Sequence, residues 1–451
     1  MFLFMGIIDK LFGQSKRVQQ LEGQIKALQM RSNDILINAS TSIFPNYTVL
    51  ESIDAYCTMD DVYSVISYLA DTAARIPMFG YKVVNDNNLK SMRKHGQISL
   101  QGKYHRVKAL QDLQPSDKFE QFMSSISYQD RVKYYTILYI TGELFLYKEV
   151  LELGPNAGQV ILHTMNNQNV TVIISEGFPQ HIIGYEYLDA GFSGRLSTDE
   201  VIHVKYYNPM VSNGQQWRGL SPLQVLSKRL TRLEAGMDAS VAQMQNGGVP
   251  GIVYEKSDYA VEVLGQRKND FAKYLRNAAN KGAPYFAAGE MGYVELGLKL
   301  ADMEVTDMQK IDFTKLCNAY KFPEVLLNNT DASTYNNVNA AMKMLYTNSI
   351  LPNIHIFRDA LIEGIVPHYA KDGVKRTIEI DLSDIPALQD DMKAQADALS
   401  AMWWVTPNEK RMIQHFEVLP DPAMDEILVD GGKQFLSDLS MTVPDVTNPI
   451  A

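Results

Sequence analysis

The sequence predicts an α+β protein built from more than one substructure. Between residues 144 and 207, short runs of alternating apolar residues are separated by Gly, Pro and Asn, which is typical of antiparallel strands. On both sides of this region, apolar residues recur at steps of three and four, as in amphipathic helices. At 451 residues the chain is also too long for one ordinary core.

The composition, 46% hydrophobic and 21% charged, is that of a soluble globular protein. The two cysteines, Cys57 and Cys317, lie far apart and form no CxxC pair, which argues against a disulfide scaffold or a cysteine zinc site and fits a reducing cytoplasm. The apolar run Met1–Ile8 is interrupted at once by Asp9 and Lys10. We therefore expect neither a signal peptide nor a membrane span.

The net charge of −10 is concentrated at one end of the chain. From Glu379 onward there are 14 acidic and 4 basic residues, while the preceding part carries equal numbers of both. A protein that holds DNA tightly usually has a basic excess. The charge pattern therefore argues against a static DNA binder.

The first 57 residues read as an N-terminal arm and a polar connector, with the structured body beginning near Thr58. Apolar residues at helical spacing predict a helix over 62–76 that Pro77 ends, followed by a strand over Phe79–Val83. The basic, polar stretch Asn85–Lys108 is expected to be a loop or a hairpin. One long helix is then predicted from Ser116 to about Ile140.

Five strands of one antiparallel sheet are expected next: Leu144–Val150, Val160–His163, Asn169–Ser175, His181–Tyr187 and Glu200–Tyr207. His163, His181 and His203 alternate with apolar residues in these strands. No carboxylate-rich spacing accompanies them, so we interpret them as sheet or core residues and expect no metal site.

A long apolar seam marks the next segment. Ser221 and Pro222 resemble an N-cap and the first residue of a helix. The seam extends over roughly 36 Å at 1.5 Å per residue and ends before Gly247. Its members are Leu223, Leu226, Leu230, Leu233, Met237, Val241 and Met244.

A small mixed insert separates this helix from a second one. Within the insert we expect strands at Ile252–Glu255 and Pro284–Ala287, with a helix over Val261–Ala279 between them. The second helix is predicted over Thr306–Tyr320, with Thr306 and Gln309 as a capping box, and Pro323 closes it.

A loop of small and polar residues follows: Asn328, Asn329, Thr330, Asp331, Ala332 and Ser333. A long helix over Thr334–Gly364 contains Pro352, which removes one backbone hydrogen bond and predicts a kink. A strand at Thr377–Leu382, a helix over Ile385–Met402 and a short helix capped by Thr406 complete the chain.

Catalytic motifs are absent from the sequence. It contains no GxxxxGK[ST], no HExxH and no GxGxxG after a strand. Gly219–Leu223 superficially resembles a nucleophile elbow, but it lacks the second glycine, and Ser221 reads better as a helix cap. We therefore expect no enzyme, no catalytic residue, no metal and no cofactor.

Several segments, taken in order, resemble a known family. Asp199–Pro250 begins "DEVIHVKYYNP" and continues to "RGLSPLQVLSKRL" and "NGGVPGIV". With Asp307–Asn328, Ser333–Ile354, Asp61–Tyr81 and "TPNEKR" at Thr406, it resembles the portal family of long-tailed bacteriophages. The departures from the family's pattern are Ser32–Ala55, Asn85–Lys108, Phe322-Pro323-Glu324 and Asn328-Asn329.

The resemblance implies a ring of twelve copies, each with wing, stem, clip and crown regions. The boundaries carried over are 1–57 arm, 58–214 α/β wing, 215–250 first stem helix, 251–303 mixed α/β clip, 304–325 second stem helix, 326–337 tunnel loop, 334–384 kinked helix and return to the wing, and 385–451 acidic helical crown.

The resemblance also implies partners and a place. The partners are further copies of the chain, double-stranded DNA in the channel, the large terminase subunit, a head–tail adaptor, and capsid or scaffold proteins, with no membrane. The place is the portal vertex of a virion assembled in the host bacterial cytoplasm.

The resemblance suggests three groups of candidate site residues. The tunnel loop Asn328–Ser333 would face DNA, and Lys256, Arg267 and Lys268 would dock partners at the clip. Three basic residues of the first stem helix would steer DNA or pair with acidic residues of the next subunit, and a solvated helix face is an equal alternative. These three residues are Lys228, Arg229 and Arg232.

Two other interpretations stay open at this point. A different head–tail connector ring is one, although such chains are usually much shorter. A DNA-processing enzyme such as a nuclease is the other, and it would need carboxylates that converge on a metal. A nuclease should cleave DNA in the presence of a divalent metal, whereas a portal should form twelve-fold rings without this activity.

Overall fold

The computed structural model describes residues 35–37, 49–97, 99–189, 191–246, 251–255, 291–295, 305–328, 335–383, 385–388, 392–414, 416, 418–429 and 434–435, with isolated residues between 266 and 273. Among these residues, no helix is both long and apolar enough to cross a membrane.

The body of the molecule is organised around one large apolar core. Helices surround this core because each buries one apolar stripe against the others. They are α2 (Val49–Thr58), α3 (Asp60–Ala74), α6 (Lys118–Ser125), α7 (Tyr128–Thr141) and α14 (Leu351–Tyr369). The antiparallel sheet β12-β2-β3 also contributes to the core, with strands β2 (Met78–Val83), β3 (Leu110–Asp112) and β12 (Arg376–Ile380).

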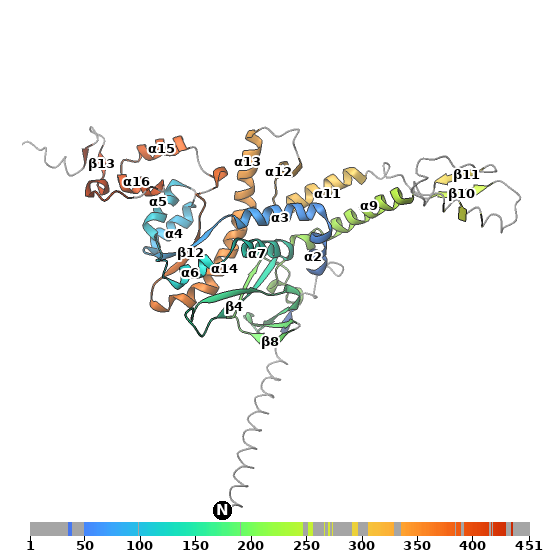
Figure 1. The fold of residues 1–451 in the computed structure, drawn as a ribbon, viewed down its shortest axis with the longest axis horizontal. Coiled ribbons are helices and arrows are strands. Elements are labelled where there is room, and N and C mark those ends of the chain that lie inside the picture. The colour runs from blue at the N-terminus through green and yellow to red at the C-terminus, as the bar shows by residue number, and fades with distance from the viewer. Residues whose placement is uncertain are drawn as a thin grey trace, which may run out of the picture.

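Two further antiparallel sheets lie below α7 in Figure 1. The first, in the order β5-β4-β9, contains β4 (Glu143–Val150), β5 (Val160–Thr164) and β9 (Val201–Lys205). The second, in the order β1-β6-β7-β8, contains β1 (Ile35–Ile37), β6 (Val170–Ile174), β7 (Ile182–Asp189) and β8 (Phe192–Leu196). The antiparallel strands are therefore confirmed, but they form two sheets, and β8 was not predicted.

The stretch Asn85–Lys108 is helical, so the expectation of a loop or hairpin was wrong. It forms α4 (Asp86–His95) and α5 (Leu100–Ala109). The Asn85 side chain caps α4 by accepting hydrogen bonds from two backbone N–H groups, and Ser99 caps α5. The apolar cluster that they form has only three buried residues, which explains why the pattern looked like a loop.

Two other boundaries also differ from the expectation. The predicted helix from Ser116 to Ile140 is interrupted, because Ser127 and Asp130 form a capping box that starts α7 anew. The body also begins before Thr58, since β1 pairs with β6 and α2 starts at Val49.

Two long helices leave the body beside each other. The first begins as α8 (Pro222–Val225) and continues as α9 (Ser227–Asn246), with a break in regular geometry at Leu226. Its partner is α11 (Val305–Ala319). Figure 1 shows α9 running away from the body toward the hairpin formed by β10 (Gly251–Glu255) and β11 (Met291–Glu295).

The strand β10 was predicted, whereas β11 was not. The expected strand Pro284–Ala287 and most of the expected helix Val261–Ala279 lie outside the described residues.

The predicted helix after the polar loop consists of α13 (Tyr335–Leu345), a π-helical segment Tyr346–Ile350, and α14. The short helix α12 (Val325–Asn328) precedes it, so Asn328 is helical and not a loop residue.

The C-terminal segment contains α15 (Met392–Ala401), α16 (Pro407–Ile413) and the short pair β13 (Leu428–Val429) and β14 (Gln434–Phe435). The capping box of Thr406 and Glu409 confirms the predicted start of α16. The helix expected over Ile385–Met402 is shorter: a 3-10 turn occupies Pro386–Leu388, and α15 begins at Met392.

Candidate functional site

The apolar seam of the first long helix is buried only in its first half. Leu223 is fully buried, and Leu230 and Leu233 are 3% and 4% exposed. One turn further out, Met237 is only half-buried, and Val241 is 51% exposed. The helix therefore leaves the core of its own chain after Leu233, and its outer half presents apolar side chains that the described part of this chain does not cover.

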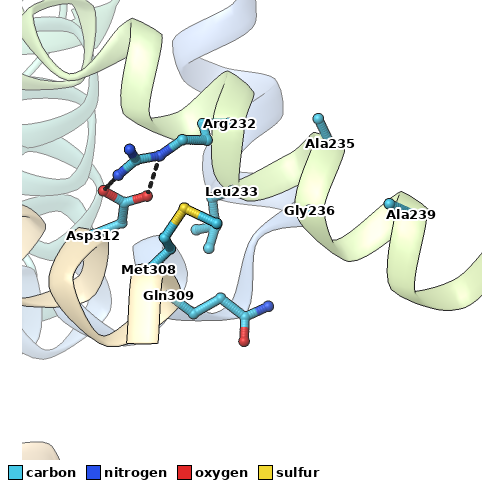
Figure 2. Close-up of a pocket in the computed structure, with 8 residues that line it drawn as sticks. All are labelled: Arg232, Leu233, Ala235, Gly236, Ala239, Met308, Gln309 and Asp312. Carbon is cyan, nitrogen blue, oxygen red and sulfur yellow. Dashed lines mark hydrogen bonds and ion pairs between the residues drawn. The ribbon is translucent and has the colours of Figure 1, made fainter. Parts of the chain in front are cut away.

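An ion-pair cluster joins the two long helices (Figure 2). Asp312 on α11 is 5% exposed, and its carboxylate accepts hydrogen bonds from Arg229 across 3.1 Å and from Arg232 Nε across 3.0 Å. The second carboxylate contact of Arg232 comes from its Nη2. Two of the three basic candidates thus pair within their own chain, whereas Lys228 is exposed to solvent.

A cavity of about 180 Å³ lies between the two helices, next to this cluster (Figure 2). Small residues of α9 form one wall, and Met308 and Gln309 of α11 form the other. The only ionisable groups in its lining are Arg232 and Asp312, which already bind each other. This lining suits the packing of an apolar side chain and offers no group for acid–base or nucleophilic chemistry. The small residues are Ala235, Gly236 and Ala239.

The start of the first long helix is held against the end of α7. The Ser221 side chain accepts a hydrogen bond from the Leu223 N–H, which confirms its predicted role as N-cap. Its hydroxyl also donates to the backbone carbonyl oxygen of Ile140. Ser221 is fully buried and committed to both contacts, so it cannot act as an exposed nucleophile.

A buried charged cluster lies beside this contact. Glu143 at the start of β4 is 1% exposed and pairs with Arg218, which is 3% exposed. Burial opposes ionisation of Glu143, but the charge of Arg218 and the contacts with His203 outweigh it and lower the pKa of Glu143 to about 2. Burial lowers the pKa of His203 to about 4. At neutral pH the cluster therefore contains a carboxylate, a guanidinium and a neutral imidazole.

The end of the second long helix binds the same corner of α7. The hydroxyl of Tyr320 donates to the carbonyl oxygen of Tyr139 across 2.9 Å, and the carbonyl oxygen of Tyr320 accepts from Ser349 in the π-helical segment. In that segment the Leu351 N–H donates to the carbonyl oxygen of Tyr346, five residues earlier. Pro352 follows directly, so the predicted irregularity of this helix has a visible backbone counterpart.

Several sequence candidates lie outside the described residues, namely Asn329–Ser333 of the polar loop and the clip residues Lys256, Arg267 and Lys268. Of the loop residues, only the backbone of Asn328 is described, as the last residue of α12. Their proposed roles stay predictions.

The described part of the chain holds no cluster of three or more His, Cys, Asp or Glu side chains that would hold a metal ion.

Comparison with known proteins gives the following matches. The family model "Phage portal protein" matches residues 60–414. An uncharacterized protein of Rickettsia bellii (strain RML369-C) is 22% identical over 369 residues, covering 80% of this chain and 87% of that protein.

Among solved structures, a chain from the virion of a native gene transfer agent particle aligns with a TM-score of 0.53 at 18% identity, covering 84% of this chain and 96% of that one. A chain from the neck of an empty gene transfer agent particle gives 0.50 at 17% identity, covering 82% and 94%. These likenesses show a shared fold and confirm the α+β class.

Proposed function

This chain belongs to the phage portal protein family, and from that premise we propose that its copies form a ring-shaped DNA channel at one capsid vertex. The ring would serve genome packaging, head–tail joining and DNA ejection. The observation that carries this proposal is the projecting α9, whose seam leaves its own core between Leu233 and Val241. A head-to-tail contact that closes on itself produces a ring, and further copies would cover the exposed half of the seam.

The regions follow from this proposal. The two sheets and the core helices form the wing, α8, α9 and α11 form the stem, and the β10–β11 hairpin belongs to the clip. The helices α15 and α16 belong to the crown, and the long helix with the π-helical segment stands behind the tunnel loop. We propose twelve copies in the assembled ring. The projection of α9 and the hairpin at its far end in Figure 1 support this division.

The charge distribution suits a conduit through which DNA slides. Each phosphate that a protein neutralises deepens binding, and six to ten such contacts already give strong affinity. In the stem, the single carboxylate of Asp312 offsets one of the two positive charges of Arg229 and Arg232. The exposed Lys228 is proposed as a basic side chain that steers DNA. The loop residues Asn329–Ser333, which follow Asn328 at the end of α12, are proposed to line the narrowest part of the channel, because they lack bulk.

Other partners follow from the same proposal. The basic residues Lys256, Arg267 and Lys268 of the clip are proposed to dock the large terminase subunit during packaging and a head–tail adaptor afterwards. The wing is proposed to contact capsid or scaffold proteins. No step requires a cofactor, a metal or a catalytic residue of this chain.

The test is to delete the loop residues Asn329–Ser333 in a particle-producing host and to compare the particles with those made with the intact chain. We expect the deletion to leave rings intact but to block DNA packaging or retention. Normal DNA-filled heads from the deletion would contradict the proposed role of this loop. Metal-dependent DNA cleavage by the pure protein would instead support the nuclease alternative.

A further inference from the structure

The chain crosses itself closely where it approaches the first stem helix. Gly142, at the end of α7, has a φ of 74°, and a Cβ there would collide with the carbonyl oxygen of Leu220. A Cβ at Gly219 would in turn collide with the carbonyl oxygen of Gly142. Two backbones therefore meet with no side chain between them, and both positions require glycine.

The buried ion pair of Glu143 and Arg218 lies beside this crossing and makes hydrogen bonds to several segments. The carboxylate of Glu143 accepts from Arg218 Nε across 3.0 and 3.1 Å and from the Gly219 N–H across 2.9 Å. Arg218 also donates to the carbonyl oxygens of Val170, across 2.6 Å, and Asn167, across 3.1 Å. One buried pair thus joins the α7–β4 corner, the start of β6 and the segment that leads into the stem.

Net stability does not explain such a pair well. Removing two charges from water costs several kcal/mol per ion, and replacing a buried ion pair by apolar residues is often neutral or stabilising. What the pair supplies is direction, because a guanidinium fork binds a carboxylate in only a few orientations. Leu223 and Leu226 already anchor the helix by burial, but apolar contacts are non-directional.

A small change in the direction of the first stem helix displaces its far end by a large distance. The helix from Pro222 to Asn246 is roughly 36 Å long, so a tilt of about 10° at its root displaces its tip by about 6 Å. In a closed ring each copy repeats the same tilt, so the interface closes only for one narrow range of angles.

We propose that Glu143 and Arg218 are positioning residues that set the angle at which the stem leaves the wing, and that they contribute little net stability. This inference rests on the proposed ring function.

The test compares three variants of the full chain: Glu143→Gln, the apolar double variant Glu143→Leu/Arg218→Met, and a matched control. The control is Glu379→Leu/Arg358→Met, which removes a buried carboxylate on β12, shared by Arg93 and Arg358, together with Arg358 on α14. We measure thermal unfolding, the fraction of closed rings in electron micrographs, and the distance between spin labels on exposed Cys57 and on an Ala242→Cys substitution at an exposed position of the outer part of α9. Labelled chains are diluted with unlabelled ones so that only distances within one chain are read.

We expect Glu143→Gln to unfold at a lower temperature, because it leaves Arg218 buried without its charge partner. We expect the apolar double variant to melt within a few degrees of the unaltered chain, yet to show a broadened label distance and at least a tenfold loss of closed rings. The control should keep a narrow distance and wild-type rings.

Wild-type rings and a narrow distance in the double variant would overturn the inference, and so would a double variant as unstable as Glu143→Gln. A third outcome separates the two proposals. If the unaltered chain forms no rings, but the label distance is narrow in the unaltered chain and broad in the double variant, the ring proposal fails and the positioning role stands.

Discussion

The hydroxyl of Ser349 donates a hydrogen bond to the backbone carbonyl oxygen of Tyr320 across 2.7 Å. This contact joins the residue that follows α11 to the π-helical segment between α13 and α14. Because Tyr320 also donates to Tyr139, the end of α7 is linked to both. A displacement of α11 would therefore act directly on the only π-helical segment in the described part of the chain.

Removing either hydrogen bond of this chain of contacts should weaken the attachment of α11 to the π-helical segment and to α7, without disturbing the rest of the core. Ser349→Ala leaves the carbonyl oxygen of Tyr320 with one hydrogen bond fewer, and Tyr320→Phe does the same to Tyr139. Each substitution should lower the free energy of unfolding by about 1–3 kcal/mol, measured by urea denaturation. In each variant, amide hydrogen exchange should become faster in Tyr346–Ile350 but not in α3. An equal increase in both segments would contradict a local role for these two hydrogen bonds.

Neutralising Asp312 should loosen the contact between α9 and α11. Asp312→Asn keeps the shape of the side chain but removes the charge that two arginines share. Because both arginines are partly exposed, we expect a loss of only about 1–2 kcal/mol, with the larger effect at low salt. Asp238→Asn, at an exposed position of α9, is the matched control and should unfold like the unaltered chain. A loss of equal size in both variants would point to general charge effects.

Glycine at position 142 should be essential for the fold. Gly142→Ala places a Cβ against the carbonyl oxygen of Leu220 and forces a positive φ on an L residue, so we expect a loss of about 2–4 kcal/mol. Gly177→Ala is the control, since Gly177 also has a positive φ but open space around it. It should cost about 1 kcal/mol. Similar melting temperatures for both variants would show that the backbone crossing yields easily.

Acid should destabilise the chain through the buried cluster. His203 has a folded pKa of about 4 against 6.5 for a free histidine, and Glu143 about 2 against 4.5 for a free glutamate. Below these free pKa values the unfolded chain therefore binds more protons than the folded one. The free energy of unfolding is highest above pH 6.5, and it falls between pH 6.5 and 4 through His203 and between pH 4.5 and 2 through Glu143. His203→Phe should reduce the stability difference between pH 7 and pH 5 by about 2 kcal/mol in urea titrations. An unchanged difference would mean that His203 is not neutral in the folded chain.

Local signals in the sequence identified much of the fold. The cap of Ser221, the capping box of Thr406 and the strand at Phe79 depend on neighbours within a few residues, so the pattern alone was sufficient. The same reasoning failed for Asn85–Lys108, because α4 and α5 bury too few apolar residues to produce a clear helical period. Their caps at Asn85 and Ser99 were the available signal.

The site was harder to predict because its contacts join distant residues. Glu143 and Arg218 are 75 positions apart, and Arg232 and Asp312 are 80 apart. No spacing rule connects such pairs in a single sequence. The basic residues were recognisable at helical spacing, but whether Asp312 belonged to the same subunit or the next one depended on the path of the chain.

A cryo-electron-microscopy reconstruction of the purified protein decides whether its copies close into a channel. We expect a closed ring of twelve 50.8 kDa chains in which α9 and α11 of successive copies surround an open axial channel. The exposed side chain of Val241 should be covered by the neighbouring copy. A stable monomer, or an assembly in which these helices point away from any symmetry axis, would contradict it.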